Sequence, residues 1–218
     1  MEIFLDIYQT EDEQVEALKK WWQENGKSAI FGVLLGLMAI FGWREWNDYK
    51  IEQATAASQL YQQMIQASRE DSSDTLSDTA KKISNNYKDT AYAVFAKLAT
   101  AKLSVANDEL ESAVVDLRWA LDNTSQDSLS HVITLRLIRV LIAQNKLGEA
   151  KTLLAPASDS GEFAGSYKEL EADILKLEGD TEGARIAYQD AIDTMQSLGQ
   201  QAPVIDLKLD DLGRSKIK

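Results

Sequence analysis

The sequence contains no cysteine, only two prolines and a single histidine among its 218 residues. The absence of cysteine excludes disulfides, thiol catalysis and cysteine-based metal sites. Proline is the residue that most strongly breaks helices, whereas alanine, leucine, glutamine, glutamate and lysine, which favour helices, are abundant. Long β-branched runs are also rare. The composition therefore predicts an all-α protein.

Positive charge is in short supply as well. The chain has 23 Lys and Arg against 35 Asp and Glu, which gives a formal net charge of −12. Proteins that bind nucleic acid present basic patches, so nucleic acid is not an expected partner. Apolar residues make up 44% of the chain, which is enough for the core of one ordinary domain with an appendage.

The residue constellations of enzymes are also missing from the sequence. The one histidine, His131, follows Ser130 at the expected start of a helix. A general base needs an orienting partner, so we interpret His131 as a surface or cap residue. No phosphate-binding loop, metal-ligand spacing or glycine-rich turn is present. We therefore predict a non-enzymatic protein without a cofactor, a metal site or catalytic residues.

One long apolar run stands out near the start of this acidic chain. From Ser28 to Trp43 no residue is charged. A spanning helix needs about 20 apolar residues, and about 17 is the lower limit. The run is slightly short, but Lys27 and Arg44 can extend toward lipid headgroups. Tryptophans typical of membrane interfaces flank it on both sides: Trp21, Trp22, Trp43 and Trp46. The sequence predicts a transmembrane helix in the lipid bilayer over 27–46.

The residues around this run predict its fate and its orientation. The preceding segment is long and acidic, and no small-x-small cleavage site follows the run, so we expect an uncleaved signal anchor rather than a removable signal peptide. Three cations precede the span and two follow it: Lys19, Lys20 and Lys27, then Arg44 and Lys50. This bias favours a cytoplasmic N-terminus. The large C-terminal part would then be periplasmic in a Gram-negative-type cell.

The segment before the span predicts a helix of its own. Thr10 and Glu13 have the spacing of a capping box, and Asn25-Gly26 is a typical helix stop. One face of the segment is apolar, with Val15, Leu18 and Trp22. We expect a short amphipathic helix at the cytoplasmic surface, and both a docking element and a simple topogenic leader fit it.

Inside the span, Gly32 and Gly36 form a G-x-x-x-G pattern. This spacing places two bare patches on one helix face, where another helix can approach closely. The pattern is also frequent by chance in membrane helices. Gly32 and Gly36 are therefore a candidate transmembrane contact face. After Trp46 no helix breaker occurs as far as Ser68, so the helix is expected to continue as a stalk. The Asp-Ser-Ser-Asp stretch at 71–74 should end it, before a second helix over 75–87.

The rest of the chain repeats one internal spacing. A turn residue is followed by alanine five positions later, a larger apolar residue after four more, and alanine after three more. The three sets are Asp108, Ala113, Leu117 and Ala120; Asn145, Ala150, Leu154 and Ala157; and Gly179, Ala184, Tyr188 and Ala191. The first alanines of the sets are 37 and 34 residues apart. Ala80, 33 residues before Ala113, marks a fourth, worn copy with Ser84 and Tyr87.

This spacing is typical of stacked helical hairpins, in which small residues let two helices touch and each hairpin covers the next. Helices are expected before the turns, over 92–105, 130–144 and 166–178. A plain bundle would not explain a period near 34, which favours tetratricopeptide-type repeats, although their signature Trp and Tyr positions are mostly missing. We expect four regions: an amphipathic cytoplasmic segment (1–26), the signal anchor (27–46), a periplasmic helical-hairpin solenoid (47–198) and a C-terminal tail (199–218).

The first helix of each hairpin lines the inner groove of such a solenoid. The repeat register predicts these groove residues: Phe95, Leu98, Lys102, Val105, Val132, Leu135, Arg139 and Ile142. An apolar groove suits extended or partly unfolded chains. The third hairpin offers charged residues instead: Glu169, Asp173 and Lys176. A second interpretation stays open, in which the apolar residues pack between repeats or against the 199–218 tail.

Three stretches together resemble one known family. They are "DEQVEALKKWWQENGK", the glycine-containing span followed by "GWREW", and the ending "PVIDLKLDDL". The chain is similar to the YfgM-type ancillary subunits of the bacterial Sec translocon. The resemblance implies an inner-membrane protein with a cytoplasmic N-terminus, association with SecYEG, and the periplasmic chaperone PpiD as a partner. It further implies transfer of unfolded exported polypeptides to periplasmic chaperones. Restraint of a stress-response regulator by residues 1–26 and a purely structural scaffold are the alternatives.

Overall fold

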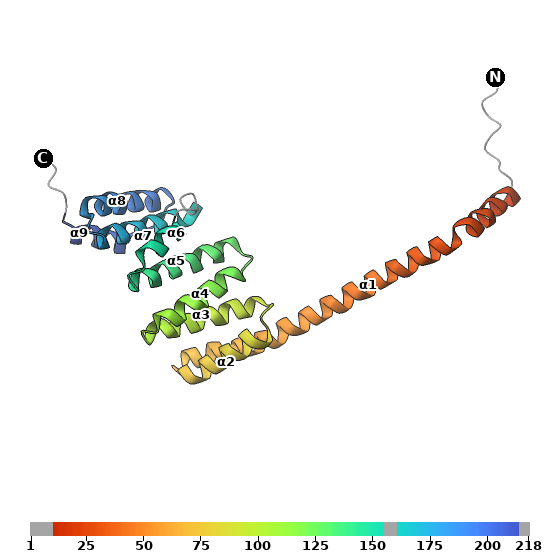
Figure 1. The fold of residues 1–218 in the computed structure, drawn as a ribbon, viewed down its shortest axis with the longest axis horizontal. Helices are drawn as coiled ribbons and strands as arrows, with labels where there is room; N and C mark the ends of the chain where they lie inside the picture. Colours follow the sequence, from red (N-terminus) through yellow and green to blue (C-terminus); the bar gives the residue numbers. More distant parts are fainter. Residues whose placement is uncertain (1–10, 155–160, 214–218) are drawn as a thin grey trace, which may run out of the picture. The chain divides into compact units, whose positions relative to one another are not determined.

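The computed structural model describes residues 11–154 and 161–213, and all regular structure in these ranges is helical (Figure 1). The helices are α1 (Glu11–Arg69), α2 (Ser73–Asn86), α3 (Ala91–Ala106), α4 (Leu110–Asp122), α5 (Asp127–Ala143), α6 (Leu147–Leu154), α7 (Ala164–Leu177), α8 (Thr181–Ser197) and α9 (Pro203–Asp211), with a 3₁₀ turn, η2 (Gly161–Phe163), before α7. The all-α prediction is confirmed.

The chain divides into two compact units, with the boundary between Gln53 and Ala54. In the first unit the described residues all belong to α1. This helix contains an 18-residue window with a mean hydropathy of 1.6, long and apolar enough to cross a membrane. Its large side chains are uncovered, and Phe31, Met38 and Phe41 are each 63% exposed. Uncovered apolar side chains of this length and density suit a bilayer rather than water.

The predicted helix stop at Asn25-Gly26 was wrong, because α1 passes through it without a break. Gly26 does not adopt the positive φ that a glycine helix stop requires. The Asn25 side chain instead donates to the Trp21 carbonyl oxygen at 3.2 Å, and the Trp22 ring lies against Gly26, 3.3 Å from where a Cβ would be. Glycine inside a helix costs about 1 kcal/mol relative to alanine, which the rest of a long helix outweighs. The predicted cap at Thr10 lies outside the described residues.

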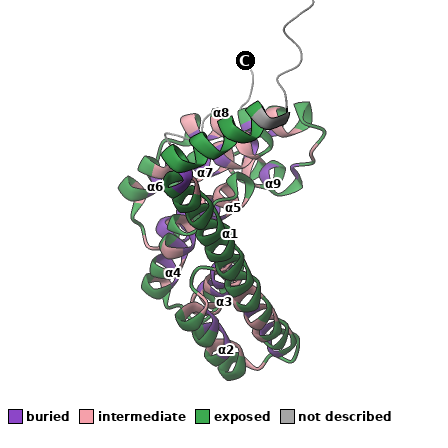
Figure 2. Ribbon diagram, turned by 90° about the vertical axis from the view of Figure 1, so that its right-hand side faces the viewer, coloured by how far each residue is buried: buried purple, intermediate pink, exposed green. Residues whose placement is uncertain are grey.

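The second unit is a stack of helical hairpins in chain order (Figure 1). The last part of α1 pairs with α2, and the pairs α3–α4, α5–α6 and α7–α8 follow, before α9. Trp119 of α4 joins two of the buried clusters, because it packs against the cluster of α1–α3 and also against the cluster that extends from α3 to α7. In Figure 2 the buried segments of α2 to α9 accordingly lie on helix faces that meet their neighbours. The buried residues form three clusters along the stack, and α7 contributes Tyr167 to one and Ala172 to the next, so that each hairpin packs on its neighbour, as stacked repeats require.

The repeat alanines that the structure describes are buried, as small residues between packed helices should be. Ala113, Ala150 and Ala184 are fully buried, at 0% exposure. The larger residues between them, Leu117 and Tyr188, are buried too, and the second alanines Ala120 and Ala191 are also at 0%. Leu154 is half-buried. The remaining predicted mark, Ala157, lies outside the described residues.

One turn geometry closes all four hairpins. A residue with a positive φ ends the first helix of each pair: Asp71 (52°), Asp108 (61°), Asn145 (58°) and Gly179 (85°). The next residue donates its N–H to the carbonyl five residues earlier: Ser72 to Ala67 (2.9 Å), Glu109 to Ser104 (2.8 Å), Lys146 to Leu141 (2.9 Å) and Asp180 to Leu175 (3.0 Å). This is the Schellman motif, which satisfies a terminal carbonyl of the helix. In each case the second helix begins two residues after the positive-φ residue.

The fourth copy exists, but its predicted register was wrong. Counted from the turn residue Asp71, the position five residues on is Leu76, and Ala80 is nine residues on. Ala80 therefore stands where Leu117 stands in the next hairpin, rather than where Ala113 stands. Both Ala80 and Ile83, twelve residues after Asp71, are fully buried. A leucine at the first position and a small residue at the second reverse the usual order of sizes.

Candidate functional site

The second unit contains a hollow of ≈ 820 Å³ between the last part of α1, α3, α4 and α5. Six of the eight predicted groove residues line it: Phe95, Leu98, Lys102, Val105, Val132 and Arg139. This volume lies within the roughly 300–1,000 Å³ range of typical ligand sites. Most of the lining is apolar, and Val105 is 44% exposed. The hollow is therefore an open apolar surface rather than a closed core cavity.

Helical spacing explains why these side chains converge. On α3 the larger lining residues, Phe95, Leu98, Lys102 and Val105, are three or four positions apart. On α5 the same holds for Val132, Arg136 and Arg139, so each set shares one helix face. The common turn fixes their level along the stack. Lys102 lies six residues before Asp108, and Arg139 lies six residues before Asn145. Successive hairpins thus present a cation at equivalent positions.

Leu135 and Ile142 do not line the hollow, in contrast to the expectation from the repeat register. Leu135 is 5% exposed and belongs to the main core cluster, and Ile142 is half-buried against the same cluster. Successive residues of an α-helix are turned by about 100°. Viewed along the helix, Leu135 and Ile142 therefore lie to one side of Val132, whereas Arg136 lies to the opposite side. They are core residues rather than groove residues.

Other lining residues were missed by the sequence analysis. These are mainly Tyr61 and Ile65 of α1, and Leu129 and Arg136 of α5. The Tyr61 ring lies 5.8 Å from that of Phe95, centroid to centroid, and so joins α1 to α3. A signal for the α1 residues was present: Asp71 precedes Asp108 by 37 residues, as Asp108 precedes Asn145. Aligning the turns rather than the alanines would have identified the end of α1 as the first helix of a hairpin.

All charged side chains among the described residues that line the hollow are positive. Lys102, Arg136 and Arg139 are its charged lining residues, and all three are exposed. Arg139 faces the Glu169 carboxylate at 3.6 Å. Lys102 and Arg136 make no hydrogen bond or ion pair with any part of the chain that the structure describes. Two cations beside the apolar lining are therefore available to an external partner.

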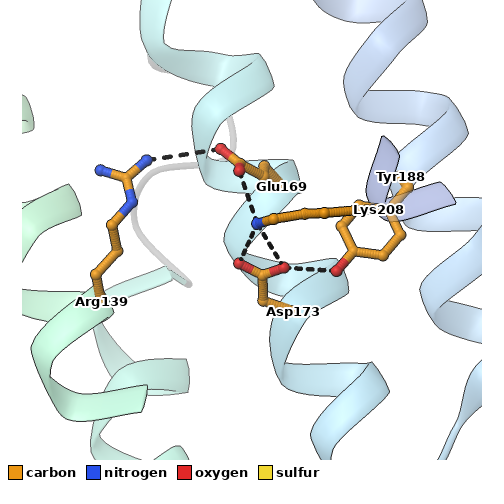
Figure 3. A network of polar contacts seen from close by, with 5 residues as sticks. All are labelled: Arg139, Glu169, Asp173, Tyr188 and Lys208. Atoms are coloured by element: carbon orange, nitrogen blue, oxygen red, sulfur yellow. Dashed lines mark hydrogen bonds and ion pairs between the residues drawn. The ribbon is translucent and has the colours of Figure 1, made fainter. Parts of the chain in front are cut away.

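The inner face of the third hairpin is used internally (Figure 3). Lys208 of α9 lies between two carboxylates of α7, with Nζ 2.8 Å from Glu169 Oε1 and 2.7 Å from Asp173 Oδ2. The Tyr188 hydroxyl of α8 also donates to Asp173. Of the three charged residues expected on the inner face of the third hairpin, Glu169 and Asp173 therefore contact the C-terminal tail, whereas Lys176 is exposed. No residue of α9 lines the hollow.

This network favours a charged lysine and a neutral tyrosine. Burial opposes the charge on Lys208, but its hydrogen bonds to Asp173 and Glu169 outweigh burial and raise its pKa above the ordinary lysine value. Burial, and then the hydrogen bond to the charged Asp173, raise the pKa of Tyr188. The docking of α9 therefore depends on groups that keep one protonation state at neutral pH.

His131 of α5 contacts both η2 and α7. Its Nδ1 is 3.0 Å from the Tyr167 hydroxyl, and its ring stacks on Phe163 with 5.1 Å between centroids. The prediction of a surface or cap position was wrong, because His131 is half-buried between hairpins. Its neighbours are aromatic rings, so it serves packing. Among the described residues no group of His, Asp and Glu side chains is arranged to hold a metal ion.

Gly32 and Gly36 lie on the exposed part of α1 in the first unit. A Cβ added at either glycine would meet no atom within 4 Å. Nothing in the described chain therefore covers the candidate contact face, and a helix of another protein has room to approach it.

Comparison with known proteins places the chain in a family. A tetratricopeptide repeat-like domain family model matches residues 19–214. The curated protein from Escherichia coli (strain K12) named ancillary SecYEG translocon subunit is 36% identical over 85% of this chain and 88% of its own. Proteins with the same name from Haemophilus influenzae (33% identical) and Aggregatibacter actinomycetemcomitans (34%) each match over 93% of this chain and 97% of their own. No solved structure matches the chain.

These alignments cover both the apolar helix and the hairpin stack, so they bear on the whole architecture and not on the repeats alone. The relatives are named for a place in an assembly rather than for a reaction. The chain belongs to the non-enzymatic family of ancillary SecYEG translocon subunits with a tetratricopeptide repeat-like domain.

Proposed function

We propose that this protein is a single-pass inner-membrane accessory subunit of the Sec translocon. Residues 27–46 anchor it as a signal anchor, residues 1–26 lie in the cytoplasm, and residues 47–198 form a periplasmic repeat domain that the 199–218 tail follows. The name of the relatives supports association with SecYEG. The exposed apolar helix supports the anchor, and the excess of lysine before the span supports the orientation.

The repeat domain holds polypeptide segments in its hollow. The observation that carries this proposal is the uncovered apolar lining, with Phe95, Leu98, Val105 and Val132 on two helices around ≈ 820 Å³. Open apolar surfaces of this kind mark interaction sites in soluble domains. The chain's own tail helix does not line the hollow, because its lysine binds the third hairpin.

Two kinds of polypeptide are the proposed occupants of the hollow. One is an unfolded exported polypeptide leaving SecYEG, and the other is a segment of the chaperone PpiD, to which that polypeptide is passed. The apolar lining binds without directional requirements, which suits clients of varied sequence. The exposed face at Gly32 and Gly36 is the proposed contact for a transmembrane helix of SecYEG or PpiD.

Site-specific photo-crosslinking in growing cells tests this function. A crosslinking amino acid at Leu98 or Val132 should capture exported polypeptides and PpiD. The matched control is Val115 of α4, which is 66% exposed and lies outside the hollow, and it should capture neither. Capture of SecYEG or PpiD from α1 positions, with no product from the hollow, would instead support a structural scaffold that touches no client.

Protease digestion tests the orientation. Protease added outside spheroplasts should degrade the hairpin stack and leave an N-terminal fragment protected by the membrane. Survival of the stack in intact spheroplasts, with loss only after lysis, would reverse the proposed topology.

A further inference from the structure

The charge of the hollow is opposite to that of the chain. The chain as a whole carries a formal net charge of −12, yet the charged lining residues of the hollow are Lys102, Arg136 and Arg139, with no carboxylate among them. A purely apolar client would not need this arrangement. The local reversal of sign in an acidic protein points to a partner with its own negative charge.

The inner surface of the stack shows where charge pairing stops. From the C-terminal end, Lys208 binds Asp173 and Glu169, and Glu169 faces Arg139 (Figure 3). Positive and negative groups thus alternate from α9 to α5. Beyond Arg139 the alternation ends, because Lys102 and Arg136 have no partner in the described part of the chain.

Occupation of the hollow would change the surroundings of these two cations. In the free protein both are exposed, and water solvates them. A segment that covers the apolar lining removes part of that water, and a desolvated charge without a partner is costly. A carboxylate supplied by the segment restores the lost interactions, and a guanidinium such as that of Arg136 can bind it through two parallel hydrogen bonds.

We propose that the hollow selects apolar polypeptide segments that carry two carboxylates, one for Lys102 of α3 and one for Arg136 of α5. This inference rests on the proposed function, in which the hollow binds polypeptide. It adds a rule of selection: acidic–apolar segments are preferred, neutral apolar segments bind more weakly, and basic apolar segments are rejected. Charge in such a site acts on specificity more than on affinity.

The test uses the full-length protein in nanodiscs of lipid without net charge. Three fluorescent peptides share one apolar sequence and carry two Glu, two Gln or two Lys at the same positions. Fluorescence anisotropy should show the Glu peptide binding roughly three- to thirtyfold more tightly than the Gln peptide, as two partly exposed ion pairs allow. The Lys peptide should bind most weakly, and empty nanodiscs give the background.

Paired variants of the protein assign the preference to the two cations. Lys102→Gln with Arg136→Gln should abolish the preference, so that this variant binds the Glu and Gln peptides with equal affinity. The control, Lys81→Gln with Lys82→Gln, removes the same charge from exposed positions of α2 outside the hollow and should keep the preference. Arg136→Glu should shift the preference toward the Lys peptide.

The outcomes separate the two proposals. Equal binding of the Glu and Gln peptides would overturn the selection rule while leaving polypeptide binding in place. A preference that survives Lys102→Gln with Arg136→Gln, or that is lost in the Lys81 and Lys82 control, would also overturn it. Absence of binding by all three peptides would overturn both the rule and the proposed function of the hollow.

Discussion

Lys208 Nζ of α9 lies 2.7 Å from Asp173 Oδ2 and 2.8 Å from Glu169 Oε1 on α7. The two carboxylates come from positions four residues apart on one helix, and their side chains are only 12% (Glu169) and 21% (Asp173) exposed. A single lysine therefore bridges two largely buried acids and fastens the last helix to the stack.

Removal of this lysine should release α9. We expect Lys208→Ala to destabilise the repeat domain by about 1–3 kcal/mol, because it leaves the poorly solvated Asp173 carboxylate without a cation and Glu169 with Arg139 alone. Hydrogen exchange should show faster exchange in α9, and the thermal unfolding temperature should fall. Lys176→Ala, which removes an exposed lysine of α7, is the control. Equal stability of both variants would mean that apolar packing alone holds α9.

The same network predicts how stability depends on pH. Both Lys208 and Tyr188 have a pKa raised by folding, so the folded state binds more protons than the unfolded state once the pH reaches the ordinary values, 10.0 for tyrosine and 10.5 for lysine. Stability from these groups is complete below those values and is lost as the pH rises above them. Urea unfolding between pH 8 and about pH 11 should show this loss. In the Tyr188→Phe variant the decline should be shallower, and an unchanged slope would contradict the prediction.

Core and hollow residues of α3 and α5 should respond differently to truncation. Leu135 is 5% exposed, so we expect Leu135→Ala to cost about 2–4 kcal/mol through lost burial and the cavity left behind. Val105 is 44% exposed on the hollow, and Val105→Ala should cost less than about 1 kcal/mol. Chemical unfolding of both variants measures the contrast. Similar losses would place Val105 in the core and remove it from the binding surface.

Substitutions at two hairpin turns should change the stability of the domain in opposite directions. Asn145 has a φ of 58° and Gly179 a φ of 85°, a region that costs side-chain-bearing residues more than glycine. Asn145→Gly should stabilise the domain by up to about 1 kcal/mol, and Gly179→Ala should destabilise it by about 1 kcal/mol. Thermal melts of the two single variants decide this. A loss of stability in Asn145→Gly would show that the asparagine side chain contributes more than its backbone strain costs.

The glycine face of α1 should matter for association and not for insertion. We expect Gly32→Leu and Gly36→Leu to reduce co-purification with the proposed partners SecYEG and PpiD, because added side chains hold a neighbouring helix away. Membrane fractionation should show normal insertion. The control is Val33→Leu, which enlarges an already exposed apolar side chain of the same helix. Unchanged co-purification of the glycine variants would leave the pattern as ordinary membrane composition.

Patterns within one or two helical turns made the fold predictable from the sequence. The spacing from Asp108 to Ala113 and its two later copies located the hairpins, because a turn and the helix it starts are local features. The Asn25-Gly26 pair showed the limit of local signals, since the apolar helix on its C-terminal side decides whether the helix continues there. The first hairpin was assigned the wrong register because Leu76 and Ala80 reverse the usual order of a small and a large residue. Either order can fill the space between two helices, but a search for one order does not find the other.

The candidate site was less accessible to sequence reasoning. The repeat register identified which side of each helix faces inward, but not which residues on that side line the hollow. Leu135 packs in the core, whereas the next residue, Arg136, lines the hollow. A register defined by one turn residue does not resolve that difference. The pairing of Lys208 with Asp173 spans 35 positions, and no local spacing indicates which of several acids a distant lysine meets.

Each main helix–helix contact of the stack joins helices no more than two places apart along the chain. Contacts of this kind close short loops, so they form quickly and do not wait for distant segments. A polypeptide delivered from its N-terminal side can therefore complete α1 and α2 and then add one hairpin at a time, each on a finished template. Among the described helices α9 comes last and packs on α8, so the order of synthesis is also the order in which this stack can become folded.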